Sequence, residues 1–570
     1  MSAPVTAVIV GAGHRGVGYA TLALHKPDML QIVGVADPDD LRRRKAAEKF
    51  GVPEENLYET AQEMAQVPQF ADAVINGTMD LDHVPTALPL LEAGYDMLLE
   101  KPICPTREEL LTLLETTRRT GRRLMIGHVL RYAPFYVAIK QRILSGDIGE
   151  VYAVHSTEAV SYHHMAVAFI RGRWAKRETN PMLLAKCCHD LDLIAWYYSG
   201  IRPAHVSSFG SRTVFCEAAA PEGAGTRCLV DCEIEPECPY SAKKNYLEQR
   251  RWGMYAFEPI EHIQDPTDED RERSLREDSP FGRCVYRTDG DVADHQSVII
   301  EFENGATASH DMITGTAQPG RHVHIWGTKG EIQGFMENGS FIIRHPDARE
   351  GCEYSEETVD VNVTMDGHGG GDLRLVEDFV RAVRGEERSI SSTEILDSIY
   401  GHLIAYAADD AMTRHLDVES LSKPVGDRRI IGSGAGIGLG RHLLAEGIDG
   451  LAIIALQGLD QGRIIRRIRH DRHIGIVLGG RPDHRRPANI DVLDRRRIIP
   501  TGGADVFERI KVDHRKIDPL DRMRLHSLDM LGIVTDRQQS AVNRRMQGLD
   551  AAIHDFRKAR DLRNIRDNQP

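Results

Sequence analysis

The chain has 570 residues, nine cysteines and a formal net charge of −14, with 41% hydrophobic and 27% charged residues. This length predicts roughly three to four domains, and the composition is typical of soluble globular proteins. The negative charge argues against nucleic acid as a partner, and no apolar stretch is long enough to span a membrane. A strand-like run begins too near the N-terminus to leave room for a signal peptide. We therefore expect a cytoplasmic protein with reduced cysteines.

Residues 1–128 alternate between apolar runs and helix-like stretches. Strands are expected at 5–10, 31–36, 71–76, 96–99 and 123–126, and helices at 15–25, 40–49, 60–66, 82–93 and 107–119. Such alternation predicts an α/β fold in which helices cover both faces of a parallel sheet. We therefore assign residues 1–128 to a Rossmann domain with a doubly wound parallel sheet.

The first apolar run ends in a Gly-x-Gly-x-x-Gly turn, which consists of Gly11, Ala12, Gly13, His14, Arg15 and Gly16. In a dinucleotide-binding turn the three glycines allow a tight turn, close approach of a pyrophosphate and close helix packing. The second run ends in Asp37, where an acid binds the adenosine ribose and repels a 2′-phosphate. The sequence therefore predicts NAD, with NADP less favoured. Three arginines follow that would blunt this preference unless they form a solvated helix face: Arg42, Arg43 and Arg44.

Strand-like runs dominate from residue 129 onward, at 150–157, 204–209, 295–303, 306–312, 321–326, 330–336 and 340–344. Alternating apolar and polar residues predict half-buried antiparallel strands. We assign residues 129–421 to an α+β domain with a large, mostly antiparallel sheet, interrupted by an insertion at 216–290. Within the insertion, Cys228, Cys232 and Cys238 could hold a structural zinc ion with Cys216 or Cys284 as fourth ligand, or they are free thiols.

Two further motifs, Glu100-Lys101-Pro102 and Gly127-His128-Val129-Leu130-Arg131-Tyr132, follow the glycine turn in order. Together they resemble the Gfo/Idh/MocA (glucose–fructose oxidoreductase / inositol dehydrogenase) family over residues 5–415. The resemblance implies an oxidoreductase for a sugar, sugar derivative or cyclitol, and a homo-oligomer that pairs through its large sheet. It also implies that Thr78, His83, Glu100 and Lys101 hold the cofactor, with Lys101 at the carboxyl end of a strand where α/β sheets bind ligands.

The segment from Leu183 to Leu193 is expected to form one helix, with Lys186, His189 and Asp190 on one face. The resemblance makes His189 the catalytic base and Asp192 the acid that steers it. Ala185 stands where relatives often carry an aspartate, so that Lys186 becomes a further catalytic candidate. Two lysines near the nicotinamide would depress each other's pKa. Substrate contacts are expected from Arg131, His163, Arg171 and His368.

The predicted reaction is hydride transfer between a substrate hydroxyl and nicotinamide. One alternative is an NAD-dependent redox glycoside hydrolase on the same fold, since the missing acid at position 185 would suit different acid–base chemistry. The other is a non-catalytic sugar- or NAD-sensing protein, against which the presence of both Lys101 and His189 argues.

Residues 422–570 differ in composition from the rest of the chain. They contain 25 Arg and 4 Lys against 17 Asp and 2 Glu, with two Phe and no Tyr, Trp or Cys. Clear apolar runs occur at 451–456 and 474–478, and the glycine-rich stretch at 431–438 lacks the strands that a nucleotide site needs. We expect a poorly structured basic extension, disordered or read out of frame, because such a segment buries too little apolar surface to offset its ordering entropy. The alternative is a genuine interaction module.

Overall fold

The computed structural model describes residues 3–361, 367–414 and 419–420, and four short segments at 443–445, 452–456, 464–470 and 473–479. The chain divides into two compact units, residues 1–431 and residues 432–570. Over these described residues, no helix has both the length and the apolar character needed to cross a membrane.

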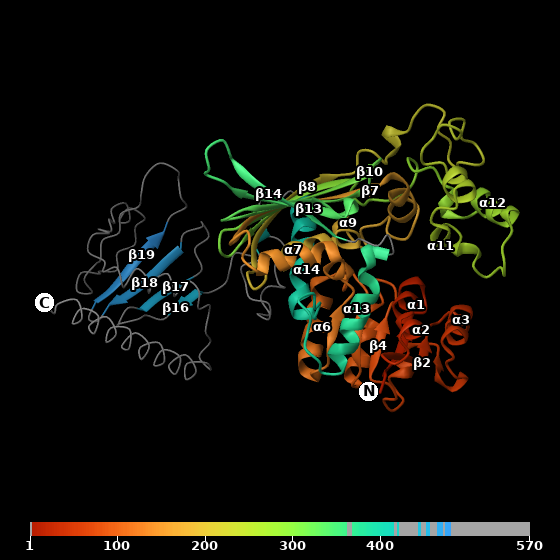
Figure 1. Ribbon diagram of the computed structural model, residues 1–570, viewed down its shortest axis with the longest axis horizontal. Helices are drawn as coiled ribbons and strands as arrows, with labels where there is room; N and C mark the ends of the chain where they lie inside the picture. The colour runs from red at the N-terminus through yellow and green to blue at the C-terminus, as the bar shows by residue number, and fades with distance from the viewer. Residues whose placement is uncertain are drawn as a thin grey trace, which may run out of the picture. The chain divides into compact units, whose positions relative to one another are not determined.

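The N-terminal part is built on a six-stranded parallel sheet in the order β3-β2-β1-β4-β5-β6 (Figure 1). Its strands are β1 Val5–Val10, β2 Leu30–Ala36, β3 Leu57–Tyr58, β4 Ala73–Asn76, β5 Asp96–Leu99 and β6 Leu124–Ile126. The predicted parallel Rossmann sheet is confirmed, and the strand order reverses between β1 and β4, where open α/β sheets bind ligands. The two-residue β3 was not predicted because so short a strand leaves no apolar run.

The helices of the N-terminal part are α1 His14–Ala20, α2 Leu22–His25, α3 Asp40–Phe50, α4 Ala61–Met64, α5 His83–Glu92 and α6 Arg107–Thr120, with a 3₁₀ turn η1 at Glu54–Asn56. α3 begins where the Asp39 carboxylate caps the Arg42 amide, and it ends at the left-handed Gly51. A helix from much later in the chain, α13 Gly367–Val383, completes this layer. Its Leu375 and Phe379 share one core with Ile9 of β1.

The second sheet has nine strands in the order β14-β13-β12-β11-β7-β10-β9-β8-β15, and among them only β7 and β10 pair in parallel. Its strands are β7 Val151–Ser161, β8 Pro203–Ser211, β9 His295–Phe302, β10 Thr307–Thr316, β11 Gly320–Gly327, β12 Glu331–Phe335, β13 Ser340–Pro346, β14 Tyr354–Asp360 and β15 Glu419–Ser420. The predicted large, mostly antiparallel sheet is confirmed. One face packs on helices, while Phe209 and Ile299 are 67% and 61% exposed on the other.

The helical elements beside this sheet are η2 Val129–Tyr132, α7 Pro134–Leu144, α8 Tyr162–His164, the π-helix η3 Met165–Ile170, α9 Met182–Ala185, α10 Cys188–Tyr197, η8 Met336–Asn338 and α14 Ile395–Arg414. Figure 1 shows α14 between the large sheet and α6. The single helix expected over 183–193 is wrong, because the chain breaks between α9 and α10 at Lys186 and Cys187. At the break, the Ala185 carbonyl accepts a hydrogen bond from the Lys101 ammonium at 3.1 Å.

The insertion between β8 and β9 forms a lobe of short elements at one end of the large sheet (Figure 1). These are η4 Glu217–Ala219, the π-helix η5 Lys243–Glu248, α11 Gly253–Ala256, η6 Glu258–Ile260, α12 Asp268–Arg276 and η7 Pro280–Gly282. The lobe reaches the N-terminal part, because Glu258 and Glu261 both bind Arg42 of α3.

The second unit contains a four-stranded antiparallel sheet of β16 Leu443–Ala445, β17 Ala452–Leu456, β18 Ile464–His470 and β19 His473–Gly479. The two apolar runs noted in the sequence coincide with β17 and β19. The glycine-rich stretch at 431–438 lies outside the described residues, and the origin of the extension stays a prediction.

Candidate active site

The glycine turn after β1 has the packing that a dinucleotide needs. A side chain at Gly11, whose φ is +80°, would place Cβ 2.6 Å from the Thr78 backbone nitrogen, and one at Gly16 would place it 2.2 Å from the Gly11 carbonyl oxygen. In contrast, no atom lies within 4 Å of a Cβ built at Gly13, which leaves that backbone open to a pyrophosphate. The Asp37 carboxylate is buried beside the turn and accepts the Ala12 amide at 2.6 Å. These residues fit a bound dinucleotide.

Other residues predicted to hold the cofactor lie around this turn. Arg15 donates to Tyr19 at 2.6 Å and to Asp372 at 3.0 Å, while the Tyr19 hydroxyl donates to Glu100 at 2.6 Å. His14 is exposed on the turn, and the Thr78 hydroxyl donates to Asn76.

The His83 ring has a different use from the predicted cofactor contact. Its Nδ1 lies 2.7 Å from the Pro102 carbonyl oxygen and its Nε2 3.1 Å from that of Thr78. The ring is fully buried between the two loops, so it positions Thr78 and Lys101 and leaves no nitrogen for the cofactor.

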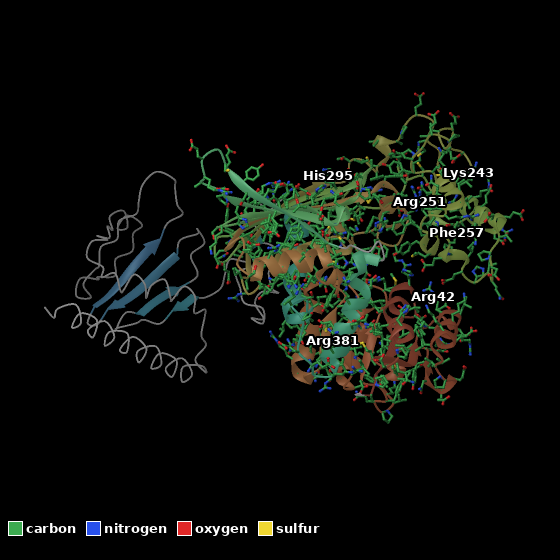
Figure 2. The ribbon with its side chains drawn as sticks, in the orientation of Figure 1. Arg42, Lys243, Arg251, Phe257, His295 and Arg381 are labelled. Atoms are coloured by element: carbon green, nitrogen blue, oxygen red, sulfur yellow. The ribbon has the colours of Figure 1, made fainter. Side chains whose placement is uncertain are left out.

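The three arginines after Asp37 are all paired with acids. Arg42 binds two glutamates of the insertion, Glu258 at 3.0 Å and Glu261 at 2.5 Å. Figure 2 labels Arg42 near Phe257 of the insertion. The other two pair locally, Arg43 with Asp40, and Arg44 with Asp40 and Glu54. Each of the three arginines therefore has a carboxylate partner, and none of these partners is Asp37.

Lys101 and His189 meet at the break between α9 and α10. Burial lowers the pKa of Lys101, but neighbouring Cys188, Glu100 and Asp80 outweigh it and raise that pKa above its usual range. Burial lowers the pKa of His189 well below its usual range, and the Lys101 charge adds to this. The pair is therefore a charged ammonium beside a neutral imidazole at pH 7. The predicted mutual depression of two lysine pKa values is wrong for Lys101.

Neither ring nitrogen of His189 has a hydrogen-bond partner, although both are buried. Its ring lies 5.7 Å from that of His128 and 5.7 Å from that of His368, measured between centroids. His368 has a left-handed backbone with φ +51°, which is uncommon for a residue with a side chain and typical of functional turns. A buried polar group without a partner needs an explanation, and both ring nitrogens of His189 are available to a ligand's hydrogen bond.

Asp192 does not steer His189, contrary to the prediction. Its two carboxylate oxygens accept Arg131 Nε and Nη2, each at 2.6 Å, and both side chains are at most 2% exposed. His128 Nε2 lies 3.8 Å from the same carboxylate. All ten residues of α10 are buried, so the spacing of Asp192 from His189 along the helix does not determine which side chain Asp192 binds. The expected substrate contact of Arg131 is replaced by this ion pair.

Lys186 enters a buried charge network instead of sharing a helix face with His189. Its ammonium binds Glu158 of β7 at 2.8 Å, and Arg321 of β11 binds both Glu158 and Asp190 at 2.8 Å. Burial alone would raise the pKa of Glu158, but the charges of Arg321 and Lys186 outweigh it and lower that pKa. The network connects β7 and β11 of the large sheet to Asp190 at the start of α10, the residue after His189.

The remaining predicted substrate contacts separate into two groups. His163 accepts a hydrogen bond from Trp252 Nε1 at 2.8 Å, and its neighbour His164 stacks on the Trp252 ring at 4.4 Å. Burial lowers the pKa of His164 well below its usual range, and the charge of nearby Lys186 adds to this. Arg171 instead donates to Tyr246 and to the Arg283 carbonyl in the insertion, so its predicted substrate contact is wrong.

The three cysteines predicted as zinc ligands lie in the insertion between β8 and β9. Among the described residues, one group has three ligand atoms within 4.8 Å of one another, and it is Cys187, Asp190 and His310. Arg321 already binds Asp190 there, which disfavours a further cation.

Comparison with known proteins identifies the fold. Residues 5–128 match the family model described as "Oxidoreductase family, NAD-binding Rossmann fold", and residues 140–400 match "Oxidoreductase family, C-terminal alpha/beta domain". The chain belongs to the Gfo/Idh/MocA oxidoreductase family. Membership makes it an NAD(P)-dependent dehydrogenase, as its resemblance implied.

Individual relatives of this family member are distant. YteT of Bacillus subtilis, provisionally named an oxidoreductase, is 26% identical over 366 residues, covering 61% of this chain and 82% of YteT. Inositol 2-dehydrogenase of Corynebacterium glutamicum is 26% identical over 227 residues, covering 39% of this chain and 59% of that protein. Among solved structures, levoglucosan dehydrogenase in complex with NADH and L-sorbose has a TM-score of 0.53 at 17% identity, covering 74% of this chain and 100% of that chain.

Several site residues of this Gfo/Idh/MocA protein were missed in the sequence. Arg321, Tyr19 and Asp372 reach the site from three distant segments. Arg321 follows the glycine that begins β11, and Asp372 follows the glycine-rich start of α13. The sequence offered one signal for Arg321 and Asp372, which is that each follows a glycine near the start of a strand or helix. This signal does not say which residue either side chain binds.

Proposed function

We propose that this protein is an NAD-dependent dehydrogenase that oxidises a hydroxyl of a sugar, sugar derivative or cyclitol, or runs the same reaction in reverse. The observation that carries the proposal is the unpartnered, buried imidazole of His189 beside the Lys101 ammonium. The names of the inositol 2-dehydrogenase and levoglucosan dehydrogenase relatives support a polyhydroxylated substrate.

His189 acts as the general base. Its lowered pKa keeps the ring neutral at pH 7, so that a ring nitrogen can accept the hydroxyl proton. Lys101 keeps its charge, binds the hydroxyl oxygen and stabilises the alkoxide that develops on it. When bound, the nicotinamide accepts the hydride from the substrate carbon.

Lys186 supplies a substrate contact in this proposal. Its ion pair with Glu158 keeps its ammonium at the edge of the site, where it can bind a second substrate hydroxyl. Trp252 of the insertion and His164 of α8 stack into one flat surface, which packs against the carbon face of a sugar ring and excludes water.

Two features support NAD over NADP. The buried Asp37 carboxylate is at the position where such folds bind the adenosine ribose, and Arg42 on the helix that follows is neutralised by Glu258 and Glu261. A 2′-phosphate would bring negative charge close to three carboxylates.

The test is a panel of sugars and inositols assayed by NADH absorbance with the wild-type protein and two variants, Lys101→Met and His189→Asn. Loss of the ammonium or the base should lower kcat by roughly 10²–10⁴-fold. The control is His205→Asn, an exposed histidine on β8 paired with Glu301, which should leave kcat unchanged. Tightly retained NAD with glycoside cleavage and no net NADH would replace this reaction by the redox hydrolase.

A further inference from the structure

Four cysteines gather at the base of the insertion. Cys228, Cys232 and Cys238 come from one irregular loop, and Cys284 comes from the returning chain. Residues 227 and 283 form an isolated antiparallel bridge. The Cys228 amide donates to the Gly282 carbonyl at 3.0 Å and the Cys284 amide to the Thr226 carbonyl at 2.8 Å. The backbone therefore brings a residue distant in sequence beside the three-cysteine loop.

One guanidinium contacts the chain around three of these cysteines. Arg171 Nη2 lies 3.4 Å from Cys228 Sγ and donates to the Tyr240 carbonyl, two residues after Cys238, at 2.9 Å. Arg171 Nε donates at 2.6 Å to the Arg283 carbonyl, next to Cys284. The same side chain therefore holds the three-cysteine loop beside the returning chain.

The region around the cysteines has little regular structure to hold it together. Between β8 and η5 it contains the three-residue η4 and the bridge at residue 227, and its chain otherwise runs in turns. Segments of this kind are commonly fastened by a disulfide or a metal, and all four cysteines are free thiols.

We propose that Cys228, Cys232, Cys238 and Cys284 form a structural zinc site that fastens the base of the insertion. Four thiolates satisfy tetrahedral zinc with Zn–S distances of about 2.3 Å. No three of these described sulfurs lie within 4.8 Å of one another, so binding has to draw them together. Cys232 lies half-exposed in the loop and is the ligand with most freedom to move inward.

This assignment sharpens the sequence prediction, because it selects Cys284 and sets Cys216 aside. Cys216 Sγ donates to the Thr213 carbonyl in the segment that enters the insertion, and Cys352 is exposed near the start of β14. The site also has a structural consequence, since Arg171, which follows η3, contacts Cys228 and so connects the site to the segment that carries His164.

The experiment measures metal in the full-length protein, purified without chelators from zinc-containing medium. We expect one zinc ion per chain by elemental analysis, and Cys→Ser at each of the four positions should lower it well below one. The matched controls, Cys216→Ser and Cys352→Ser, should keep the full amount. A chain without zinc that also fails to bind added Co²⁺ would overturn the proposal, as would iron in place of zinc.

A second measurement does not depend on variants that fold. Thiol alkylation of the native wild-type protein, followed by peptide mass mapping, should leave the four site cysteines unmodified until a strong chelator is added. Cys352, which is exposed, should react at once. Alkylation of Cys232 and Cys238 at the same rate before and after chelation would refute the site, and so would a disulfide among the four.

Discussion

The Arg131–Asp192 ion pair gives a quantitative prediction that separates structural from catalytic duty. Arg131→Met leaves a buried carboxylate without its partner, and such a carboxylate takes up a proton rather than remain charged. Protonation costs about 1.4 kcal/mol for each pH unit above the ordinary carboxyl pKa of about 3.9, so the penalty is at most about 4 kcal/mol at pH 7 and about 1.5 kcal/mol at pH 5. Protonation of His128 instead would lower these bounds.

The sign of the pH dependence follows from the raised pKa of Asp192. Burial raises this pKa in the folded protein even against the charge of Arg131, and loss of Arg131 raises it further. The variant's folded state then holds a proton that its unfolded state releases. Its stability therefore falls as pH rises from about 4 to 7, relative to wild type.

The assay is thermal unfolding at pH 5 and pH 7 followed by tryptophan fluorescence. All four tryptophans lie within residues 1–431, and Trp196 lies 5.7 Å from the Arg131 guanidinium. The double variant Arg131→Met/Asp192→Leu should recover most of the loss, because it removes both charges. Arg119→Met, which breaks an exposed pair with Glu92, should cost less than about 1 kcal/mol. An equal loss at both pH values, or no recovery in the double variant, would refute the reasoning.

Four further outcomes are expected. Glu258→Gln/Glu261→Gln should raise kcat/KM for NADP relative to NAD, while Glu248→Gln, an exposed glutamate elsewhere in the insertion, should leave the ratio unchanged. The kcat/KM profile should stay flat down to about pH 6, because burial and Lys101 lower the pKa of His189; an acid limb centred near pH 7 would contradict this. A chain ending at residue 431 should fold and bind NAD as the full chain does, since the first unit ends there, and aggregation of that chain would count against it. Light scattering should detect an oligomer that Phe209→Asp weakens; a monomeric wild type would remove the predicted pairing through the sheet.

The sheets were predictable because their signals are local. Alternation within β9, where buried Val298 and Ile300 flank exposed Ile299, depends on the strand's own residues. The glycine turn and Lys101 were identified for a similar reason, since fixed spacing in a short segment specifies a backbone geometry.

The side-chain pairings were not predictable, because they depend on segments far apart in sequence. Asp192 has the spacing to act on His189, yet a guanidinium from η2 offers it two charge-assisted hydrogen bonds. The break after Ala185 likewise depends on Lys101, 84 residues earlier. The helical pattern in residues 183–193 carries no information about a donor that comes from the loop after β5.

Helix α13 ties the two halves of the catalytic unit together in a way that restricts how the protein can be divided. Its Leu375, Val376 and Phe379 are fully buried against the first sheet, although α13 follows β14 of the second sheet in the chain. A fragment ending at residue 128 would lack α13. It would expose to water the apolar surface that α13 covers and should be prone to aggregate. The nucleotide-binding half therefore cannot be transferred to another protein by itself. Such a fusion would have to include α13.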